Sequence, residues 1–177
     1  MTDANEEETA VTTANTGTTG TTRTTTARMK NPAYVLPDAM KGIRTIFTSL
    51  YQGGVAPKLL ELVHLRASQI NGCSACVFGG VDSARKHGVT DDQLHALVAW
   101  REAPFFSDEE RAALALTEAA TRIADRSGKA VPDEVWDAAA DHFGEEQLSA
   151  IILMIGLTNF FNRINTTIEE PAGTTWG

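Results

Sequence analysis

The only two cysteines of the chain, Cys73 and Cys76, lie three residues apart in the stretch Asn-Gly-Cys-Ser-Ala-Cys. Gly72 favours the end of one helix, so we expect Cys73 at the start of the next. Free backbone N–H groups and the helix dipole stabilise a thiolate at such a start. At this spacing the two sulfurs lie on one helix face, close enough to form a disulfide. The pair therefore predicts reversible thiol chemistry in which Cys73 is the readily exchanged thiol.

Two other interpretations of the cysteine pair remain open. A structural zinc site usually takes four ligands from two paired motifs. The chain has no second cysteine pair, and its four histidines lack zinc-finger spacing. Cysteine is also often a buried core residue, so the pair could be two small packed side chains. Without an export signal, a structural disulfide is the least favoured interpretation.

An acidic residue upstream of the pair is a candidate proton acceptor. Glu61 lies in the otherwise apolar stretch Leu-Leu-Glu-Leu-Val-His-Leu, twelve residues before Cys73. At i, i+4 spacing it begins a stripe of residues that leads towards the cysteine pair. A carboxylate there could accept a thiol proton directly or through water. The alternative is a solvated charge beside Lys58 or Arg66.

Composition limits the class of protein that positions these residues. The chain has 177 residues, 42% of them hydrophobic and 21% charged, which suits a single globular domain. A net charge of −8 argues against binding to nucleic acids or to anionic membranes. No apolar run approaches the roughly 18 residues of a membrane span, and no signal peptide is evident. These features predict a cytoplasmic protein.

The chain divides into a tail and a helical domain. Residues 1–30 are rich in Thr, Gly and Ala and lack apolar anchors, so they predict a disordered tail. Residues 31–177 predict one domain of the all-α class, a compact bundle of about six helices, because no strand pair is evident. The helical patterns cover residues 36–54, 56–71, 74–86, 90–102, 107–126, 132–143 and 144–168. Two of them open with capping boxes, Thr90 with Gln93 and Ser107 with Glu110.

Glu61 and the stretch Leu-Arg-Ala-Ser-Gln-Ile-Asn-Gly-Cys-Ser-Ala-Cys at residues 65–76 resemble the alkylhydroperoxidase D-like branch of the carboxymuconolactone decarboxylase family. The likeness covers about residues 33–170. It implies an all-helical fold that assembles into trimers or larger homo-oligomers. It also implies a thiol-dependent peroxidase or disulfide reductase that acts on a hydroperoxide, with electrons from a dithiol protein or a small thiol. In that resemblance the catalytic residues are Cys73, Cys76 and Glu61, and neither a metal nor an organic cofactor is needed.

One position departs from the family pattern. The family places a histidine four residues after the second cysteine, where this chain has Gly80. His64, three residues after Glu61, is the candidate proton relay in its place. His87 would lie about 16 Å along the helix from Cys76, which excludes it within that helix. Loss of acid–base help would slow a peroxidase by about 10²–10⁴-fold without abolishing thiol–disulfide exchange.

Three further features allow more than one interpretation. Gly79 and Gly80 predict a kink, a close helix contact or room for a substrate. Three aromatic residues could line an entrance for an organic peroxide or belong to the core: Trp100, Phe105 and Phe106. Three polar residues on an apolar helix need partners and could cap, link subunits or face a cavity: Asn159, Asn162 and Arg163.

The sequence thus favours a thiol-dependent peroxidase or disulfide oxidoreductase with an antioxidant role. Two alternatives belong to other classes. Gly80 and the Thr-rich tail would also suit a redox-sensing or non-catalytic interaction protein that kept the fold. A lactone-acid decarboxylase is the third hypothesis, although the cysteine pair fits the redox branch better.

Overall fold

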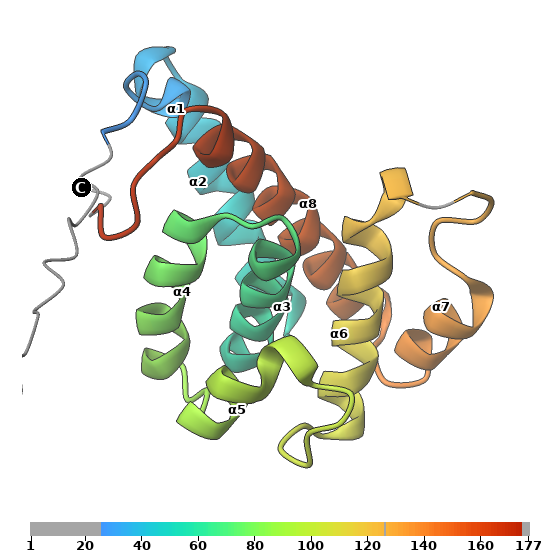
Figure 1. Ribbon diagram of the computed structural model, residues 1–177. Helices are drawn as coiled ribbons and strands as arrows, with labels where there is room; N and C mark the ends of the chain where they lie inside the picture. Colours follow the sequence, from blue (N-terminus) through green and yellow to red (C-terminus); the bar gives the residue numbers. More distant parts are fainter. Residues whose placement is uncertain (1–25, 126, 175–177) are drawn as a thin grey trace, which may run out of the picture.

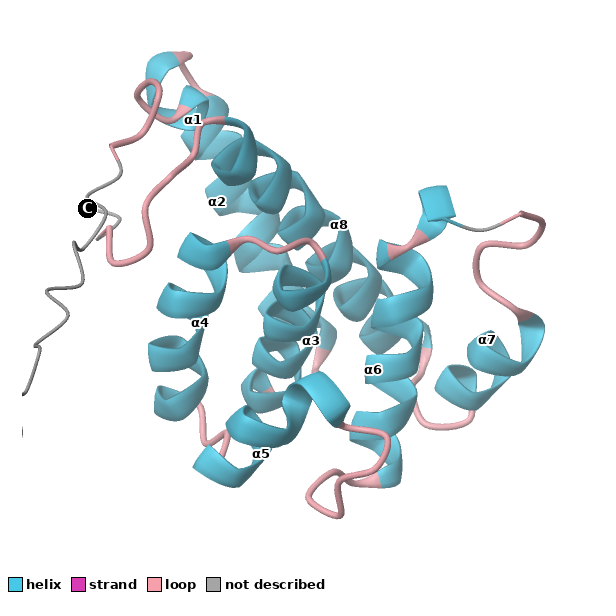
Figure 2. Cartoon of the chain, viewed as in Figure 1, coloured by secondary structure: helices cyan, strands magenta, loops and turns pink. Residues whose placement is uncertain are grey.

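The computed structural model describes residues 26–125 and 127–174, which form helices and connecting loops (Figures 1 and 2). These residues contain eight α-helices and no strand, which confirms the all-α prediction. The α-helices are α1 (Pro32–Val35), α2 (Ala39–Leu50), α3 (Pro57–Ile70), α4 (Ser74–Lys86), α5 (Asp91–Ala96), α6 (Asp108–Thr121), α7 (Asp133–Ala140) and α8 (Glu145–Thr167). Seven of them, α2 to α8, correspond to the helical patterns of the sequence, and the four-residue α1 is the one that those patterns missed. The tail predicted for residues 1–30 lies mostly outside the described residues.

Helix α3 is the centre of the bundle. It packs against α4, α6 and α8, and Figure 1 shows it between α4 and α6 with α8 behind. Pro57 occupies its first turn, where the missing N–H has no cost. Its core side chains, which include Leu60, Leu62 and Leu65, are almost completely buried. A buried central helix is a rigid platform for the polar residues that it carries.

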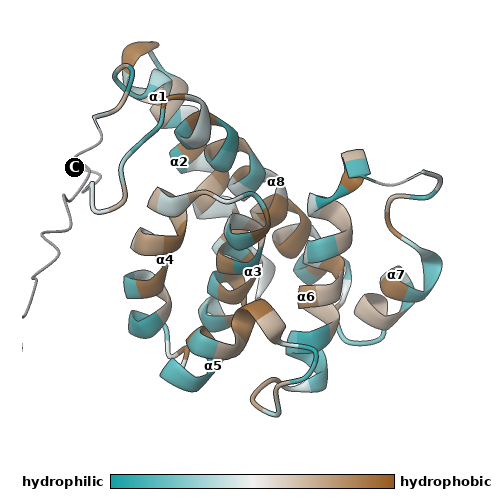
Figure 3. Ribbon diagram, in the orientation of Figure 1, coloured by the Kyte–Doolittle hydropathy of each residue, from teal (hydrophilic) through white to brown (hydrophobic). Residues whose placement is uncertain are grey.

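The turn between α3 and α4 fixes the position of the cysteines. Gly72 adopts a positive φ of 66°, which favours glycine and ends α3. Cys73 is the N-cap of α4, and its Sγ accepts the backbone N–H of Cys76. Helix α4 runs over Ser74–Lys86 as predicted. Figure 3 shows hydrophobic turns in its first half and hydrophilic turns towards its end. The prediction that Cys73 begins this helix is confirmed.

The capping boxes also form as predicted. Thr90 pairs reciprocally with Gln93 at the start of α5, and Ser107 with Glu110 at the start of α6. Helix α5 is nevertheless shorter than the pattern over residues 90–102 indicated, because a 3₁₀ turn follows at Leu97–Ala99. The buried side chains around this turn pack against α3 and α6, so tertiary packing overrides the local helical pattern.

The lysine and the arginine of α3 bind carboxylates of α6. Arg66 forms an ion pair with Glu118 at 2.6 Å, and Lys58 pairs with Glu110 at 2.8 Å. Burial raises the pKa of Glu118, but hydrogen bonds from Trp100, Arg66 and Arg101 outweigh it and hold that pKa below its ordinary value. Glu61 itself is buried, so the alternative interpretation of a solvated charge beside Lys58 or Arg66 is wrong.

Helix α8 contains the longest apolar segment of the described chain. By length and composition alone it could cross a membrane, so the expectation that no apolar run approaches the length of a membrane span is wrong for this helix. Its contacts with α2, α3 and α6 instead make it a core helix of this bundle. Its polar residues are used internally, since Asn71 donates to both Asn159 and Asn162, and Asn162 donates to Ser68.

The three aromatic residues separate between core and surface. Trp100 and Phe106 are buried in a cluster between α3 and α6, whereas Phe105 is exposed. None of them lines the cavity at the cysteine pair. The core interpretation holds for two of the three.

The two ends of the described chain lie beside each other. The backbone N–H of Arg28 donates to the carbonyl of Ile168, just after α8. The Arg28 side chain binds the Thr167 carbonyl and the carboxylate of Glu169. These bonds hold the segment before α1 against the end of α8, close to the start of α4 (Figure 1).

Candidate functional site

The cysteine pair forms a disulfide at the start of α4. The Cα atoms of Cys73 and Cys76 are 5.3 Å apart, and the two residues are only 2% and 8% exposed. The pair is thus buried, as the core interpretation expected, but it is also covalently linked. Among the described residues, no three His, Cys, Asp or Glu side chains gather in a way that could hold a metal ion.

An open cavity of about 480 Å³ lies beside one cysteine only. The start of α4 contributes Cys73 and Ser74, and the end of α8 contributes Asn165. Glu169 and Glu170, in the segment after α8, add two carboxylates to its lining. The second cysteine is not among the lining residues. A small molecule or an extended chain in this cavity would therefore lie beside Cys73 rather than Cys76.

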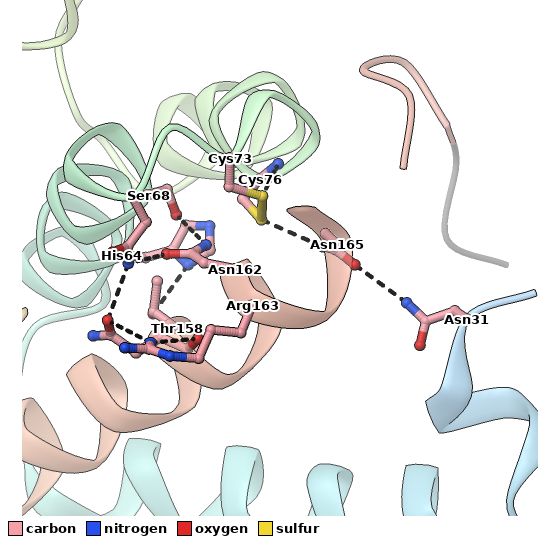
Figure 4. Close-up of a disulfide and its surroundings, with 11 residues drawn as sticks. Asn31, His64, Ser68, Cys73, Cys76, Thr158, Asn162, Arg163 and Asn165 are labelled. Carbon is pink, nitrogen blue, oxygen red and sulfur yellow. Dashed lines mark hydrogen bonds between the residues drawn. A yellow bond between two sulfur atoms is a disulfide. The ribbon is translucent and has the colours of Figure 1, made fainter. Parts of the chain in front are cut away.

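The sulfur of Cys76 points towards α8 instead. The side-chain Nδ2 of Asn165 donates to this sulfur over 3.3 Å, and both residues are buried. Asn31, at the N-cap of α1, donates in turn to the Oδ1 of Asn165. Figure 4 shows the disulfide facing Asn165, with Asn31 on its far side. Helix α8, far from the cysteines in sequence, therefore contacts the disulfide directly, and Asn31 is linked to it through Asn165.

Glu61 is buried on α3 and contacts α4. Its Oε1 accepts a hydrogen bond from the hydroxyl of Ser83 at 2.7 Å and lies 3.2 Å from Nδ1 of His87. Burial and the negative charge of Glu61 raise the pKa of Tyr51, which keeps that phenol protonated. Although His87 cannot reach the cysteines along α4, it meets Glu61 across the α3–α4 contact. A buried carboxylate beside an imidazole is suited to accepting and passing a proton.

His64 lies one helical turn after Glu61, between α4 and α8. Its Nδ1 is 3.2 Å from the hydroxyl of Thr158. Burial lowers the pKa of His64, while the charge of Glu61 and a hydrogen bond to the Cys76 backbone act in the opposite direction. The imidazole is therefore neutral at neutral pH, the form that can accept a proton.

The imidazole of His64 occupies the space in front of Gly80. A Cβ atom at position 80 would lie 3.0 Å from Cδ2 and 3.1 Å from Nε2 of His64, and 2.8 Å from Cδ2 of Leu65. A Cβ at Gly79 would meet nothing within 4 Å. The close-contact interpretation is thus confirmed for Gly80 and does not apply to Gly79. The absent side chain at position 80 makes room for the histidine of α3.

Sequence reasoning missed three residues around the site, Asn165, Asn31 and Ser83, and excluded a fourth, His87. Asn165 and Asn31 are distant from the cysteines in sequence, and an asparagine carries no pattern that reveals a sulfur contact. Ser83 and His87 follow the second cysteine by about two and three helical turns, spacings that place them on the α4 face turned towards α3. That spacing was the one available signal for their contact with Glu61.

Comparisons with known proteins agree with this architecture. Residues 37–119 match the model of the carboxymuconolactone decarboxylase family. The uncharacterized protein YdfG of Bacillus subtilis (strain 168) is 36% identical over 138 residues, which are 78% of this chain and 92% of YdfG. YnjA of Escherichia coli (strain K12), also uncharacterized, is 35% identical over 117 residues, 66% of this chain and 62% of YnjA.

Two solved structures share the fold. A crystal structure from Agrobacterium tumefaciens, of a protein of unknown function suggested to be the antioxidant defence protein AhpD, is 30% identical with a TM-score of 0.76. The match covers 85% of this chain and all of that one. The apo debrominase Bmp8 is 22% identical with a TM-score of 0.68, over 78% and 73% of the two chains, and supports the fold alone. From these matches we conclude that the chain belongs to the carboxymuconolactone decarboxylase family, in its alkylhydroperoxidase D-like branch.

Proposed function

We propose that this protein is a thiol-dependent oxidoreductase that reduces organic hydroperoxides, with an antioxidant role. The observation that carries the proposal is the Cys73–Cys76 disulfide at the start of α4, beside an open cavity. The likeness to the Agrobacterium protein suggested to be AhpD supports the same class of activity. No metal or organic cofactor enters the proposed reaction.

In the oxidative half-reaction, one cysteine thiolate attacks the peroxide bond of the hydroperoxide. The O–O bond breaks, an alcohol leaves after protonation, and the cysteine becomes a sulfenic acid. The second thiol then attacks that sulfur, forming the disulfide and releasing water. Two thiols are thereby oxidised and one hydroperoxide is reduced. The short spacing of the pair makes the second step intramolecular.

In the reductive half-reaction, a dithiol protein or a small thiol restores the pair. Because Cys73 lines the cavity and Cys76 does not, the donor thiolate attacks Cys73. A mixed disulfide forms at Cys73, and Cys76 leaves as a thiolate. A second donor thiol then attacks the donor sulfur of that mixed disulfide and releases Cys73. The net result is an oxidised donor and a reduced protein.

Proton transfer in this proposal falls to residues between α3 and α4. His64 is neutral and held at the backbone of Cys76, so it is the base that takes the thiol proton. Glu61, whose negative charge raises the proton affinity of His64, is the upstream acceptor. His87 and Ser83 hold the carboxylate of Glu61 in place. In this scheme His64 replaces the histidine that the family pattern places at position 80.

A redox-sensing protein without efficient turnover is the second candidate, and Gly80 is the observation that favours it. Such a protein would form and break the same disulfide but would consume hydroperoxide slowly. A lactone-acid decarboxylase would instead retain its activity with both thiols blocked. The sequence-based expectation of a cytoplasmic protein is compatible with both the peroxidase and the redox sensor, because the cytoplasm supplies dithiol reductants.

The direct test is a steady-state assay with an organic hydroperoxide and a small dithiol as electron donor. The wild-type protein is expected to consume hydroperoxide, and both Cys73→Ser and Cys76→Ser are expected to stop turnover. Ser149→Ala, which changes an exposed residue of α8 outside the cavity and keeps both thiols, is the control and should retain activity. Undiminished turnover in both cysteine variants would remove the basis of the proposal.

A further inference from the structure

One side chain outside the cysteine motif touches a reacting atom. Asn165 is 4% exposed, and its Nδ2 lies 3.3 Å from the sulfur of Cys76. Asn31 is 5% exposed, and its Nδ2 lies 3.2 Å from the Oδ1 of Asn165. The three residues come from α1, α8 and α4, so only the folded chain brings them together (Figure 4). None of these contacts is needed to build the disulfide itself.

The direction of each hydrogen bond follows from a fixed donor at one end. The backbone N–H of Ala33 donates to the Oδ1 of Asn31 at 3.0 Å, and a backbone N–H can only donate. This bond fixes Oδ1 of Asn31 towards Ala33 and leaves its Nδ2 facing Asn165. The oxygen of Asn165 must therefore face Asn31, and its N–H group must face Cys76. The sulfur receives a donor, not an acceptor.

From this arrangement we infer that Asn165 stabilises the Cys76 thiolate when the disulfide opens, and that Asn31 positions Asn165 for this role. The inference rests on the proposed thiol–disulfide chemistry and extends it to residues outside the motif. When a donor thiolate bonds to Cys73, the bond between the two cysteine sulfurs breaks and its electron pair stays on Cys76. The N–H of Asn165 then donates to an anion, and such hydrogen bonds are stronger than those between neutral groups.

The charges around the site make a neutral donor valuable. Glu169 and Glu170 line the cavity and disfavour an additional negative charge there. Arg28 neutralises part of this charge through its bond to Glu169. His64 bonds the backbone of Cys76 and is neutral. Among the described residues, Asn165 is the one side chain outside the cysteine pair recorded as donating to the Cys76 sulfur.

The donor also selects which sulfur is attacked. A disulfide opens faster when the departing sulfur is the more stabilised thiolate. Asn165 stabilises Cys76 as the leaving group, and Cys73 is the cysteine that lines the cavity from which the thiol approaches. Both observations therefore favour a mixed disulfide at Cys73. Asn31, which orients Asn165, directly follows the segment that binds the end of α8 through Arg28.

The experiment compares Asn165→Leu with Asn162→Leu in the full chain, without any hydroperoxide. Asn162 is a matched control because it is also a buried asparagine of α8, one turn earlier, and it bonds Ser68 and Asn71 instead of sulfur. The first readout is the rate at which a small dithiol reduces the disulfide. The second is the pH dependence of thiolate absorbance in the reduced protein, and the third is the site of the mixed disulfide trapped with a monothiol.

Asn165→Leu is expected to slow reduction by about tenfold, to raise the pKa of the Cys76 thiol, and to let part of the mixed disulfide form at Cys76. Asn162→Leu is expected to lower thermal stability while leaving all three readouts unchanged. Asn31→Ser, which keeps an N-cap residue on α1 but loses the bond to Asn165, should slow reduction by roughly threefold. It also provides the test if Asn165→Leu does not fold.

Two results would overturn the inference. One is an unchanged reduction rate and thiol pKa in folded Asn165→Leu, or in Asn31→Ser if the former does not fold. The other is an equal effect of Asn165→Leu and Asn162→Leu, which would indicate a structural role. Failure of the proposed peroxidase activity would be distinguishable, because the wild-type protein would then leave hydroperoxide intact while Asn165 still controlled the exchange rate.

Discussion

At the scale of single residues, the buried acid and its histidine neighbours have a defined arrangement. Glu61 is held by Ser83 and His87, while His64 lies one turn away and contacts the backbone of Cys76. A free histidine would be largely protonated below its ordinary pKa of 6.5, but burial lowers the pKa of His64. Its base form therefore persists to lower pH than that of an exposed histidine. The neutral form is the one that can accept a proton, and the charge of Glu61 restores part of the basicity that burial removes.

Replacing His64 by Gln tests its role as the base. Gln keeps a polar side chain of similar size but cannot take up a proton, so oxidation of the reduced protein by hydroperoxide should slow by about 10²-fold. The measurement is the rate of thiol loss as a function of pH. His95→Gln, on α5 away from the cysteines, is the control. A rate profile of His64→Gln identical to that of the wild type would exclude His64 as the relay.

The same titration affects stability. The pKa of His64 is lower in the folded protein than in the unfolded chain. Above about pH 6.5 the imidazole is neutral in both states, so it makes the free energy of unfolding no more pH-dependent. Below that pH the unfolded chain takes up the proton first, so the free energy of unfolding falls as the pH drops towards the folded pKa. His64→Gln should flatten this part of the pH dependence of the free energy of unfolding, whatever its effect on activity.

At the scale of elements, the contact between α3 and α4 depends on one glycine. Leu65 and His64 of α3 fill the space that a side chain at Gly80 would need. A histidine at position 80 and the present position of His64 are therefore incompatible. The chain carries its candidate relay histidine on α3, whereas the family pattern places that histidine on α4.

Gly80→Ala is expected to destabilise the protein by about 1–2 kcal/mol, because overpacking against Leu65 outweighs the better helix propensity of alanine. Gly79→Ala, in the same helix with open space around it, should stabilise by roughly 0.5–1 kcal/mol. Urea unfolding of the two variants measures the difference. Stabilisation by both substitutions would contradict the close contact at Gly80.

At the scale of the whole molecule, the sequence predicted the class of fold and most element boundaries. Periodicity, Pro57, Gly72 and the two capping boxes act locally, so they could be read without coordinates. The burial of Glu61 could not be predicted in this way. The neighbouring cations, Lys58 and Arg66, pair with carboxylates of α6, and these contacts depend on how the two helices pack. The contact of Asn165 with Cys76 depends on how α8 packs, which no local signal encodes. The parts of the site that the sequence did not predict are therefore those that depend on contacts between residues far apart in the chain.

Association with a second copy of the chain is a further whole-molecule expectation, implied by the family resemblance. Apolar side chains stay exposed in the described chain on α2, at Ile46 and Phe47, and on α8, at Leu153 and Phe160. Exposed apolar groups of this size are typical of interaction surfaces. Light scattering should give a multiple of the chain mass, and Phe160→Glu should reduce it. Val98→Glu, at an exposed residue outside both helices, is the control, and a monomeric wild-type protein would contradict the expectation.

The central claim is that Cys73 and Cys76 are oxidised together by a hydroperoxide. Its most direct measurement is a single-turnover reaction of the fully reduced protein with cumene hydroperoxide, with no electron donor present. The account predicts one alcohol formed for each pair of thiols lost, with peptide mass spectrometry locating the new disulfide between Cys73 and Cys76. Hydroperoxide that remains intact while both thiols persist would contradict it. So would alcohol formation in both Cys73→Ser and Cys76→Ser at the rate of the wild-type protein.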